Sequence, residues 1–207
     1  MKLLLQKALA QNHLVLADHI QGKLIRFLEL LLQWNRVFRL TAISDPSEAV
    51  WLHLIDSLVI MPWIQGERII DVGSGGGLPG IPLALVFPEK QFFLLDSNGK
   101  KARFLQQAVL ELELPNVSVV HARAEDWHPD PGFDLVMTRA FSTLRLMLTQ
   151  TAHLVREGGI FLAMKGAYPE KELSELPHTH RVSGVHRLSV AGLDAERHLV
   201  CLMTSKD

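Results

Sequence analysis

The stretch Asp71-Val72-Gly73-Ser74-Gly75-Gly76-Gly77-Leu78-Pro79-Gly80 continues a short apolar run that begins at Arg68. A run of this length predicts a buried strand, and the glycines after it let the backbone turn tightly and approach a ligand closely. No Gly-Lys-Ser or Gly-Lys-Thr follows, so the stretch is not a Walker phosphate loop. It therefore predicts a strand, a ligand-binding loop and a helix, in that order.

Two ligand classes fit this loop. Gly75, Gly77 and Gly80 satisfy the G-x-G-x-x-G fingerprint of dinucleotide-binding folds, whereas Asp71, Gly73 and Gly75 form the D-x-G-x-G pattern of S-adenosylmethionine loops. The strand ends just before Gly73, so Gly73 is the first turn glycine, and Asp71 would set a negative charge against a pyrophosphate. Carboxylates at strand ends instead attract the ammonium and sulfonium of S-adenosylmethionine. The register of the glycines favours S-adenosylmethionine.

Strands and helices alternate beyond the loop, which is typical of a parallel sheet covered by helices on both faces. The last two strands are separated by only a short turn near Gly192, so they should pair antiparallel. The predicted fold class is α/β, a Rossmann-like S-adenosylmethionine-dependent methyltransferase fold with a mostly parallel sheet and a terminal antiparallel hairpin. After Arg68–Val72, the predicted strands are Gln91–Leu95, Val117–Val120, Phe133–Met137, Ile160–Met164, Val182–Val190 and His198–Met203, and the predicted helices are Gly99–Leu112 and Thr143–Val155.

The first 65 residues are expected to be helical. An apolar stripe at helical spacing runs from Ile20 to Phe38, and Asp18 with Gln21 resembles a capping box at its start. A second helix begins at Asp45-Pro46-Ser47-Glu48 and is expected to end near Met61. We therefore divide the chain into an N-terminal helical region, residues 1–65, and an S-adenosylmethionine-binding methyltransferase domain, residues 66–207.

Polar residues at the ends of strands are candidate cofactor contacts, because ligands of such sheets bind beyond the carboxyl ends of the strands. Asp96 ends the second strand, where its carboxylate can accept hydrogen bonds from both ribose hydroxyls. Ala124 and Glu125 follow the third strand, where their backbone groups can read the adenine edge. Arg139 ends the fourth strand and can pair with the methionine carboxylate or with a substrate phosphate. Lys165 has the same geometry after the fifth strand.

Composition narrows the class of protein. The chain has 207 residues, of which 48% are hydrophobic and 21% charged, as in an ordinary soluble protein. A single cysteine, Cys201, excludes a disulfide framework within the chain and a cysteine-rich zinc site. The apolar runs are too short to span a membrane, and we expect a cytoplasmic protein. The formal net charge is −1, so any contact with nucleic acid must come from a local basic patch.

His53 and Asp56 lie three residues apart on one face of a predicted helix. Two ligands are too few for a metal site, so the spacing favours a hydrogen bond within the helix. We expect no metal.

Together these motifs resemble the small-subunit ribosomal RNA methyltransferase G family, formerly called glucose-inhibited division protein B. The match covers nearly the whole chain, and its most specific part is the loop Gly73–Pro82 combined with His53-x-x-Asp56-Ser57. Arg39 stands where the family usually has asparagine, and Leu52 where it usually has arginine. Further matching motifs are Trp34-Asn35, Leu40-Thr41, Asp45-Pro46, Leu94-Leu95-Asp96-Ser97, Gly99-Lys100-Lys101, Arg139-Ala140-Phe141 and Lys165-Gly166.

The resemblance implies that S-adenosyl-L-methionine supplies a methyl group to N7 of one guanine in bacterial 16S rRNA. The expected partner is 16S rRNA or the assembling small ribosomal subunit, and the protein is expected to be a monomer. No residue is expected to act as a catalytic base, since guanine N7 carries no proton. Carried over by position, the resemblance assigns cofactor contacts to Gly73, Leu78, Ala124, Glu125 and Arg139, to which Asp96 is added from strand geometry.

Three other functions fit parts of the sequence. A methyltransferase for a small molecule or a protein agrees with the slightly negative net charge. A nicotinamide-dependent oxidoreductase agrees with Gly75-x-Gly77-x-x-Gly80. A non-catalytic sensor of an adenosyl ligand would use the N-terminal helices to bind a partner.

Overall fold

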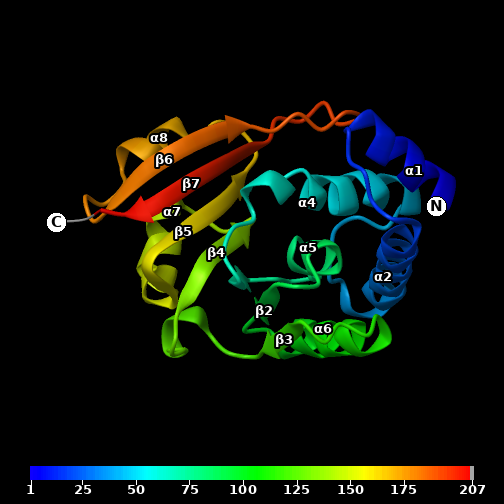
Figure 1. Cartoon of the computed structure of the whole chain (residues 1–207), viewed down its shortest axis with the longest axis horizontal. Helices are drawn as coiled ribbons and strands as arrows, with labels where there is room; N and C mark the ends of the chain where they lie inside the picture. The colour runs from blue at the N-terminus through cyan, green and yellow to red at the C-terminus, as the bar shows by residue number, and fades with distance from the viewer. Residues whose placement is uncertain (206–207) are drawn as a thin grey trace.

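The computed structural model describes residues 1–205, so the last two residues of the predicted methyltransferase domain lie outside the described part. Seven strands form one sheet in the order β3-β2-β1-β4-β5-β7-β6 (Figure 1). The pairs among β1 to β5 are parallel, whereas β7 pairs antiparallel with both β5 and β6. The predicted fold class is confirmed. The strands are β1 (Arg68–Val72), β2 (Gln91–Leu95), β3 (Val117–Val120), β4 (Phe133–Arg139), β5 (Val155–Lys165), β6 (His180–Arg187) and β7 (His198–Thr204).

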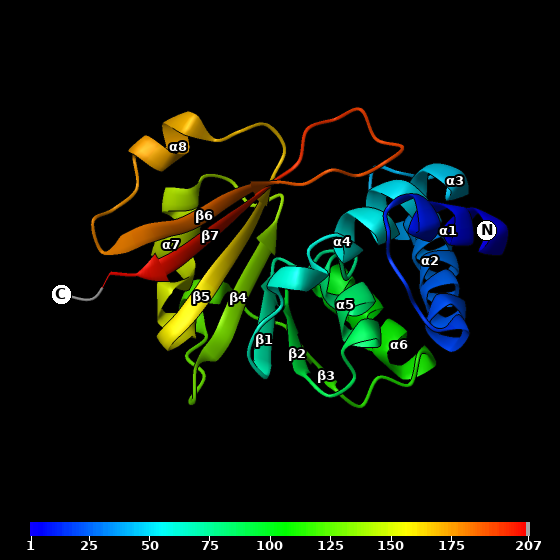
Figure 2. The same ribbon diagram turned by 45° about the horizontal axis from the view of Figure 1, so that its top comes forward.

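Helices cover both faces of the sheet. Figure 2 shows α5, α6 and the N-terminal helices on one side of the sheet and α7 and α8 on the other. The α-helices are α1 (Lys2–Gln11), α2 (Asp18–Phe38), α3 (Pro46–Ala49), α4 (Asp56–Leu58), α5 (Gly80–Val86), α6 (Gly99–Glu111), α7 (Leu144–Thr151) and α8 (Glu170–Ser174). A π-helical turn, η1 (Val50–Ile55), joins α3 to α4, and the short 3-10 turns are η2 (Met61–Trp63), η3 (Ala124–Asp126) and η4 (Ala152–Leu154).

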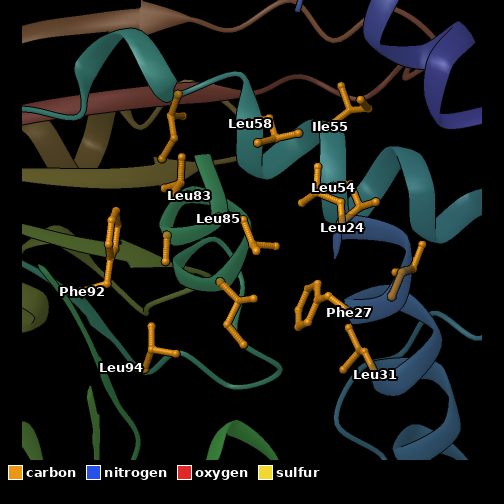
Figure 3. Close-up of a cluster of buried hydrophobic side chains, with 14 of the residues drawn as sticks. Leu24, Phe27, Leu31, Leu54, Ile55, Leu58, Leu83, Leu85, Phe92 and Leu94 are labelled. Atoms are coloured by element: carbon orange, nitrogen blue, oxygen red, sulfur yellow. The ribbon is translucent and has the colours of Figure 1, made fainter. Parts of the chain in front are cut away.

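The N-terminal helices share a buried apolar cluster with the sheet. Figure 3 shows Phe27 and Leu31 of α2 across from Leu83 and Leu85 of α5, with Phe92 of β2 on the far side of α5. Helix α5 therefore lies between the helical region and the sheet. The division between residues 65 and 66 is a proposed boundary, and this cluster crosses it.

The two predicted starts of N-terminal helices turned out differently. Asp45 caps α3, because its Oδ1 accepts from Glu48 N at 2.8 Å. The capping box at Asp18 was wrong: Asp18 is already the first helical residue, and Gln21 Nε2 donates to Leu16 O at 2.8 Å instead. The helix predicted to run to Met61 is also interrupted, because its middle is the π-helical turn η1.

The connection between the last two strands was mispredicted. Strand β6 ends at Arg187, and residues 188–197 form a long loop in place of the short turn. Leu188 and Val190 are buried in the cluster shared with the N-terminal helices. Ala191 N donates to Asn12 Oδ1 at 2.8 Å, which ties the loop to the end of α1. The alternating apolar residues Leu188 and Val190, which resemble a strand pattern, are explained by their packing against the N-terminal helices.

The predicted helix Thr143–Val155 ends early, at Thr151, and β5 begins at Val155 instead of Ile160. Val155 pairs with Phe133 of β4 before the register shifts. Gly158, with φ of +74°, lies in the part of β5 that the shift leaves out of this pairing. The predicted strand residues Ile160–Met164 all lie in β5.

We predict that Gly80→Ala lowers the free energy of unfolding by about 1–3 kcal/mol, because a forced contact in a packed core must be relieved by a shift. A Cβ at Gly80 would lie against the Leu94 side chain and 2.8 Å from Asp71 Oδ2. Urea unfolding measures the change.

The matched control is Gly22→Ala, at an exposed position in the second turn of α2, where a Cβ would meet nothing within 4 Å. This substitution should raise the free energy of unfolding by about 0.5–1 kcal/mol, since alanine restricts the unfolded chain. Equal effects at the two glycines would contradict the packing argument.

Candidate functional site

The glycine loop is folded tightly against the end of β2. Gly73, Gly75 and Gly77 have φ of +73°, +57° and +79°, a region that side chains disfavour. Gly73 N and Ser74 N both donate to Leu95 O, at 2.8 and 3.1 Å. The loop backbone therefore faces the carboxyl ends of β1 and β2.

Asp96 joins this loop to the start of α6. Its side chain is buried, with Oδ2 accepting from Gly75 N at 2.9 Å and Oδ1 from Asn98 N at 2.8 Å. Lys101 Nζ lies 4.0 Å from Oδ2. An ionised carboxylate has about four acceptor positions, so this one retains capacity for ligand hydroxyls.

Asp71 lies beneath the loop. Its Oδ2 accepts from Gly80 N at 3.0 Å, and its Oδ1 is buried without a hydrogen-bond partner among residues 1–205. Burial raises the pKa of the Asp71 carboxyl to about 7, against the lowering effect of the Gly80 hydrogen bond. A carboxyl this deeply buried can act on a ligand at the loop through its charge but not through direct contact.

A cavity of about 160 Å³, here called the glycine-loop cavity, lies beyond the ends of β1, β2 and β3. It brings together four of the six predicted cofactor residues: Gly73, Asp96, Ala124 and Glu125. The lining also includes Phe141 and Gln150, neither of which the sequence singled out as a cavity residue. Ala124 and Glu125 belong to the short turn η3. The Glu125 carboxylate is exposed, with Oε1 3.7 Å from Arg123 Nη1.

The other two predicted residues lie elsewhere. Leu78 is half-buried against the shared apolar cluster and lines neither this cavity nor the next. Arg139 lines a second cavity of about 180 Å³, here called the arginine cavity. Its lining consists of Asp56, Arg139, Ala140, Met164, Lys165, Gly166 and Arg197.

Arg139 is tied to the segment η1–α4. Its Nη2 donates to Leu52 O at 2.7 Å and lies 3.2 Å from Asp56 Oδ2, and its Nη1 donates to Ser57 Oγ at 3.4 Å. Arg197 Nε donates to Asp56 Oδ1 at 2.8 Å. Arg197 was missed by sequence reasoning, because no local motif marks an arginine at the end of a loop.

The expected hydrogen bond between His53 and Asp56 is absent from the described residues. His53 Nε2 bonds with Thr41 Oγ1 at 3.0 Å, and Asp56 faces the two arginines. Burial, and next the charge of Arg139, lower the pKa of His53 to about 4. His53 is therefore neutral at neutral pH.

Within residues 1–205, no group of three metal-binding side chains is assembled. No helix in that range is long and apolar enough to cross a membrane.

Comparison with known sequences identifies relatives along most of the chain. The family profile described as rRNA small subunit methyltransferase G matches residues 20–200. A protein from Marinobacter nauticus, named ribosomal RNA small subunit methyltransferase G, is 51% identical over 95% of this chain and 92% of its own length. A protein of the same name from Methylococcus capsulatus is 56% identical over 86% of each chain.

Solved structures with similar folds are methyltransferases of low sequence identity. The glycopeptide N-methyltransferase MtfA in complex with S-adenosylhomocysteine has a TM-score of 0.65 at 10% identity, over 74% of this chain and 87% of that one. A methyltransferase from Aquifex aeolicus, described as dependent on S-adenosylmethionine, has a TM-score of 0.60 at 15% identity, over 80% and 97%. These likenesses support the fold.

We predict that Asp96→Ala weakens binding of S-adenosylhomocysteine about ten- to a hundredfold, the usual effect of losing hydrogen bonds to a charged group. The substitution also frees the Gly75 and Asn98 amides that Asp96 now holds. Calorimetry measures the affinity, and circular dichroism should show an intact fold. An unchanged affinity would remove Asp96 from the site.

We also predict that affinity for S-adenosylhomocysteine rises with pH up to about 7 and levels off above it, as the Asp71 carboxyl ionises. The ligand ammonium stabilises the ionised carboxylate, so the pKa of Asp71 falls on binding and a proton is released. Calorimetry in buffers of different ionisation enthalpy counts that proton. Asp71→Asn should flatten the profile, and a wild-type affinity independent of pH would contradict the coupling.

Proposed function

The chain belongs to the rRNA small subunit methyltransferase G family, and we propose that it methylates N7 of one specific guanine in bacterial 16S rRNA. S-adenosylmethionine is the proposed methyl donor, in agreement with the fold and the family. The proposed partner is 16S rRNA or the assembling small subunit, met by a monomer in the cytoplasm, where that RNA is made.

One observation supports this function above the others: two cavities of different chemistry are lined by neighbouring residues at the end of β4. Phe141 lines the glycine-loop cavity, and Arg139, two residues earlier, lines the arginine cavity. An adenosyl group in the first cavity would direct its methionine end toward the second. The arginine cavity then lies where a nucleotide substrate must approach the methyl group.

A nicotinamide dinucleotide fits the same loop poorly. In dinucleotide-binding folds the pyrophosphate sits at the N-terminus of the helix after the loop. Here Gly80 N, at the start of α5, is already bonded to the Asp71 carboxylate at 3.0 Å. A negative charge in that place disfavours a pyrophosphate.

The proposed reaction needs no general base. Guanine N7 has an in-plane lone pair and no proton, so it can attack the sulfonium methyl in one in-line displacement. The methyl carbon gains the bond to N7 as its bond to sulfur breaks, and sulfur keeps the electron pair. The positive charge moves from sulfur to the guanine ring, where backbone carbonyls can stabilise it.

Positioning is therefore the main task proposed for the side chains. In this proposal Arg139 holds the methionine carboxylate. Its hydrogen bonds to Leu52 O and Ser57 Oγ restrict the orientation of its guanidinium group. Leu78 and Gly73 are proposed to contact the cofactor along the loop. No role is assigned to a metal.

RNA contacts are proposed for a small set of cations, since the net charge is −1. Arg36 and Arg39 are exposed at the end of α2, and Lys100 is exposed at the start of α6. Trp34 of α2 packs on Phe104 of α6, with ring centroids 5.7 Å apart, so the two helices that carry these cations are neighbours. Lys101 and Arg145 complete the proposed set.

The decisive test is mapping of N7-methylguanine in 16S rRNA from a strain that lacks the gene, with and without the wild-type chain supplied on a plasmid. One methylation site should disappear in the deletion strain and return on complementation. An unchanged pattern of N7-methylguanine would reject the rRNA substrate and leave the methyltransferase for a small molecule or protein.

We predict that the single-turnover rate with bound RNA and cofactor is nearly flat through neutral pH, because no proton leaves in the step. The pKa of His53 lies near 4, so its titration falls below that range. His53→Gln should therefore leave the shape of the profile unchanged. A steep limb near pH 6.5, the ordinary histidine value, that disappears in His53→Gln would show that a titrating base takes part.

A further inference from the structure

Asp56 is the most enclosed charged group at the arginine cavity. Its residue is 2% exposed, and its carboxylate is shared between two arginines from distant parts of the chain. Oδ2 lies 3.2 Å from Arg139 Nη2, and Oδ1 accepts from Arg197 Nε at 2.8 Å. One carboxylate therefore fixes the end of β4 and the start of β7 relative to α4.

The charges around Asp56 do not cancel. Lys165 also lines the cavity, but its Nζ is paired with Glu172 at 2.8 Å and with Ser142 O at 2.7 Å. Among the residues that line the cavity, the single charge of Asp56 faces two guanidinium groups, which leaves one positive charge in excess; Asp71, outside the lining, acts on Arg139 from the side of the glycine loop. The side chains of Arg139 and Arg197 are 22% and 20% exposed, so this excess charge is only partly solvated.

The two arginines differ in the donors they still offer. Arg139 Nη1 donates to Ser57 and its Nη2 contacts Leu52 O and Asp56, whereas its Nε makes no hydrogen bond within residues 1–205 and stays available for the cofactor. Arg197 uses Nε for Asp56 and Nη1 for Glu196 O, and its Nη2 makes no hydrogen bond within residues 1–205. Arg197 therefore keeps its Nη2 donors for an anion in the cavity.

We propose that Asp56 is a positioning residue that aligns Arg139 with the cofactor and Arg197 with a phosphate of the RNA backbone beside the target guanine. The proposal rests on the proposed rRNA substrate and deepens it. By holding both arginines with one carboxylate, Asp56 sets the distance between the methionine end of the cofactor and the nucleotide that receives the methyl group. An alignment of this kind is made before the reaction and lowers its barrier.

A purely structural ion pair is the competing explanation. A buried carboxylate between two arginines would then stabilise the fold alone, and its loss would change stability without changing how the two ligands are bound. The tests below separate these explanations, because they measure cofactor binding, RNA binding and the coupling between two side chains.

The main test compares Asp56→Asn, Arg197→Gln and the double variant, each with S-adenosylhomocysteine in calorimetry and with 16S rRNA in steady-state methylation. Asp56→Asn should weaken both ligands, each about tenfold, as expected for one lost charge-assisted hydrogen bond. Arg197→Gln should raise the RNA KM by about the same factor and leave cofactor affinity within about twofold. The double variant should have an RNA KM no higher than that of Asp56→Asn, because the two side chains act as one unit.

Asp134→Asn is the matched control. Asp134 is a half-buried carboxylate on the same strand, β4, near its other end, where it pairs with Arg156 and accepts from Glu67 N and Arg68 N. Its substitution should lower the melting temperature and leave cofactor affinity and RNA KM unchanged. The same loss of ligand binding in Asp134→Asn would show that general destabilisation is enough, and would overturn the proposal.

Two further outcomes overturn it: a folded Asp56→Asn with both affinities within twofold of the wild type, or additive losses in the double variant. If Asp56→Asn does not fold, Arg197→Gln decides through the salt dependence of RNA binding. Loss of one phosphate contact should reduce the log–log slope by about 0.7 on single-stranded RNA, and an unchanged slope overturns the proposal. If the wild type does not methylate rRNA, the proposed function fails, and the calorimetry of Asp56→Asn alone decides the role of Asp56.

Discussion

The close contact between the end of β1 and the start of α5 is the constraint on which the rest of the structure depends. Asp71 Oδ2 accepts from Gly80 N at 3.0 Å, and Gly80 has no side chain to hold the helix away from the strand. Helix α5 can therefore lie close to the sheet. Its outer surface then receives α2, so the N-terminal helices cover α5 and meet the sheet through it. The same contact fixes both ends of the glycine loop and turns its backbone toward β2.

This arrangement separates charges along the carboxyl edge of the sheet. The acids Asp71 and Asp96 lie under and beside the glycine loop, whereas Arg139 and Arg197 lie beyond β4 and β5. S-adenosylmethionine carries its cations in the middle and its carboxylate at one end, and RNA carries phosphates. Acids at the loop and arginines beyond it therefore complement both ligands of the proposed reaction without a basic surface overall.

The sequence predicted the first three strands to the residue, because each is an apolar run bounded by glycine, proline or polar residues. It failed where long-range contacts decide the structure. Leu188 and Val190 alternate like strand residues but are buried against the N-terminal helices. Asp56 meets arginines 83 and 141 residues further along the chain, and no local pattern contains that pairing. The resemblance to a family supplied Leu78 as a site residue, which strand-end geometry alone would not have selected.

Ala140 explains how one strand end can serve two cavities. Its φ is +53°, a left-handed conformation that costs a residue with a side chain about 1–2 kcal/mol. Strain of this size persists only when neighbouring contacts fix the backbone on both sides. Arg139 is fixed by its bonds to Leu52, Asp56 and Ser57, and Phe141 packs in the glycine-loop cavity. The kink sends these two side chains in different directions, so that the cofactor and the nucleotide proposed as substrate would meet on either side of one strained alanine.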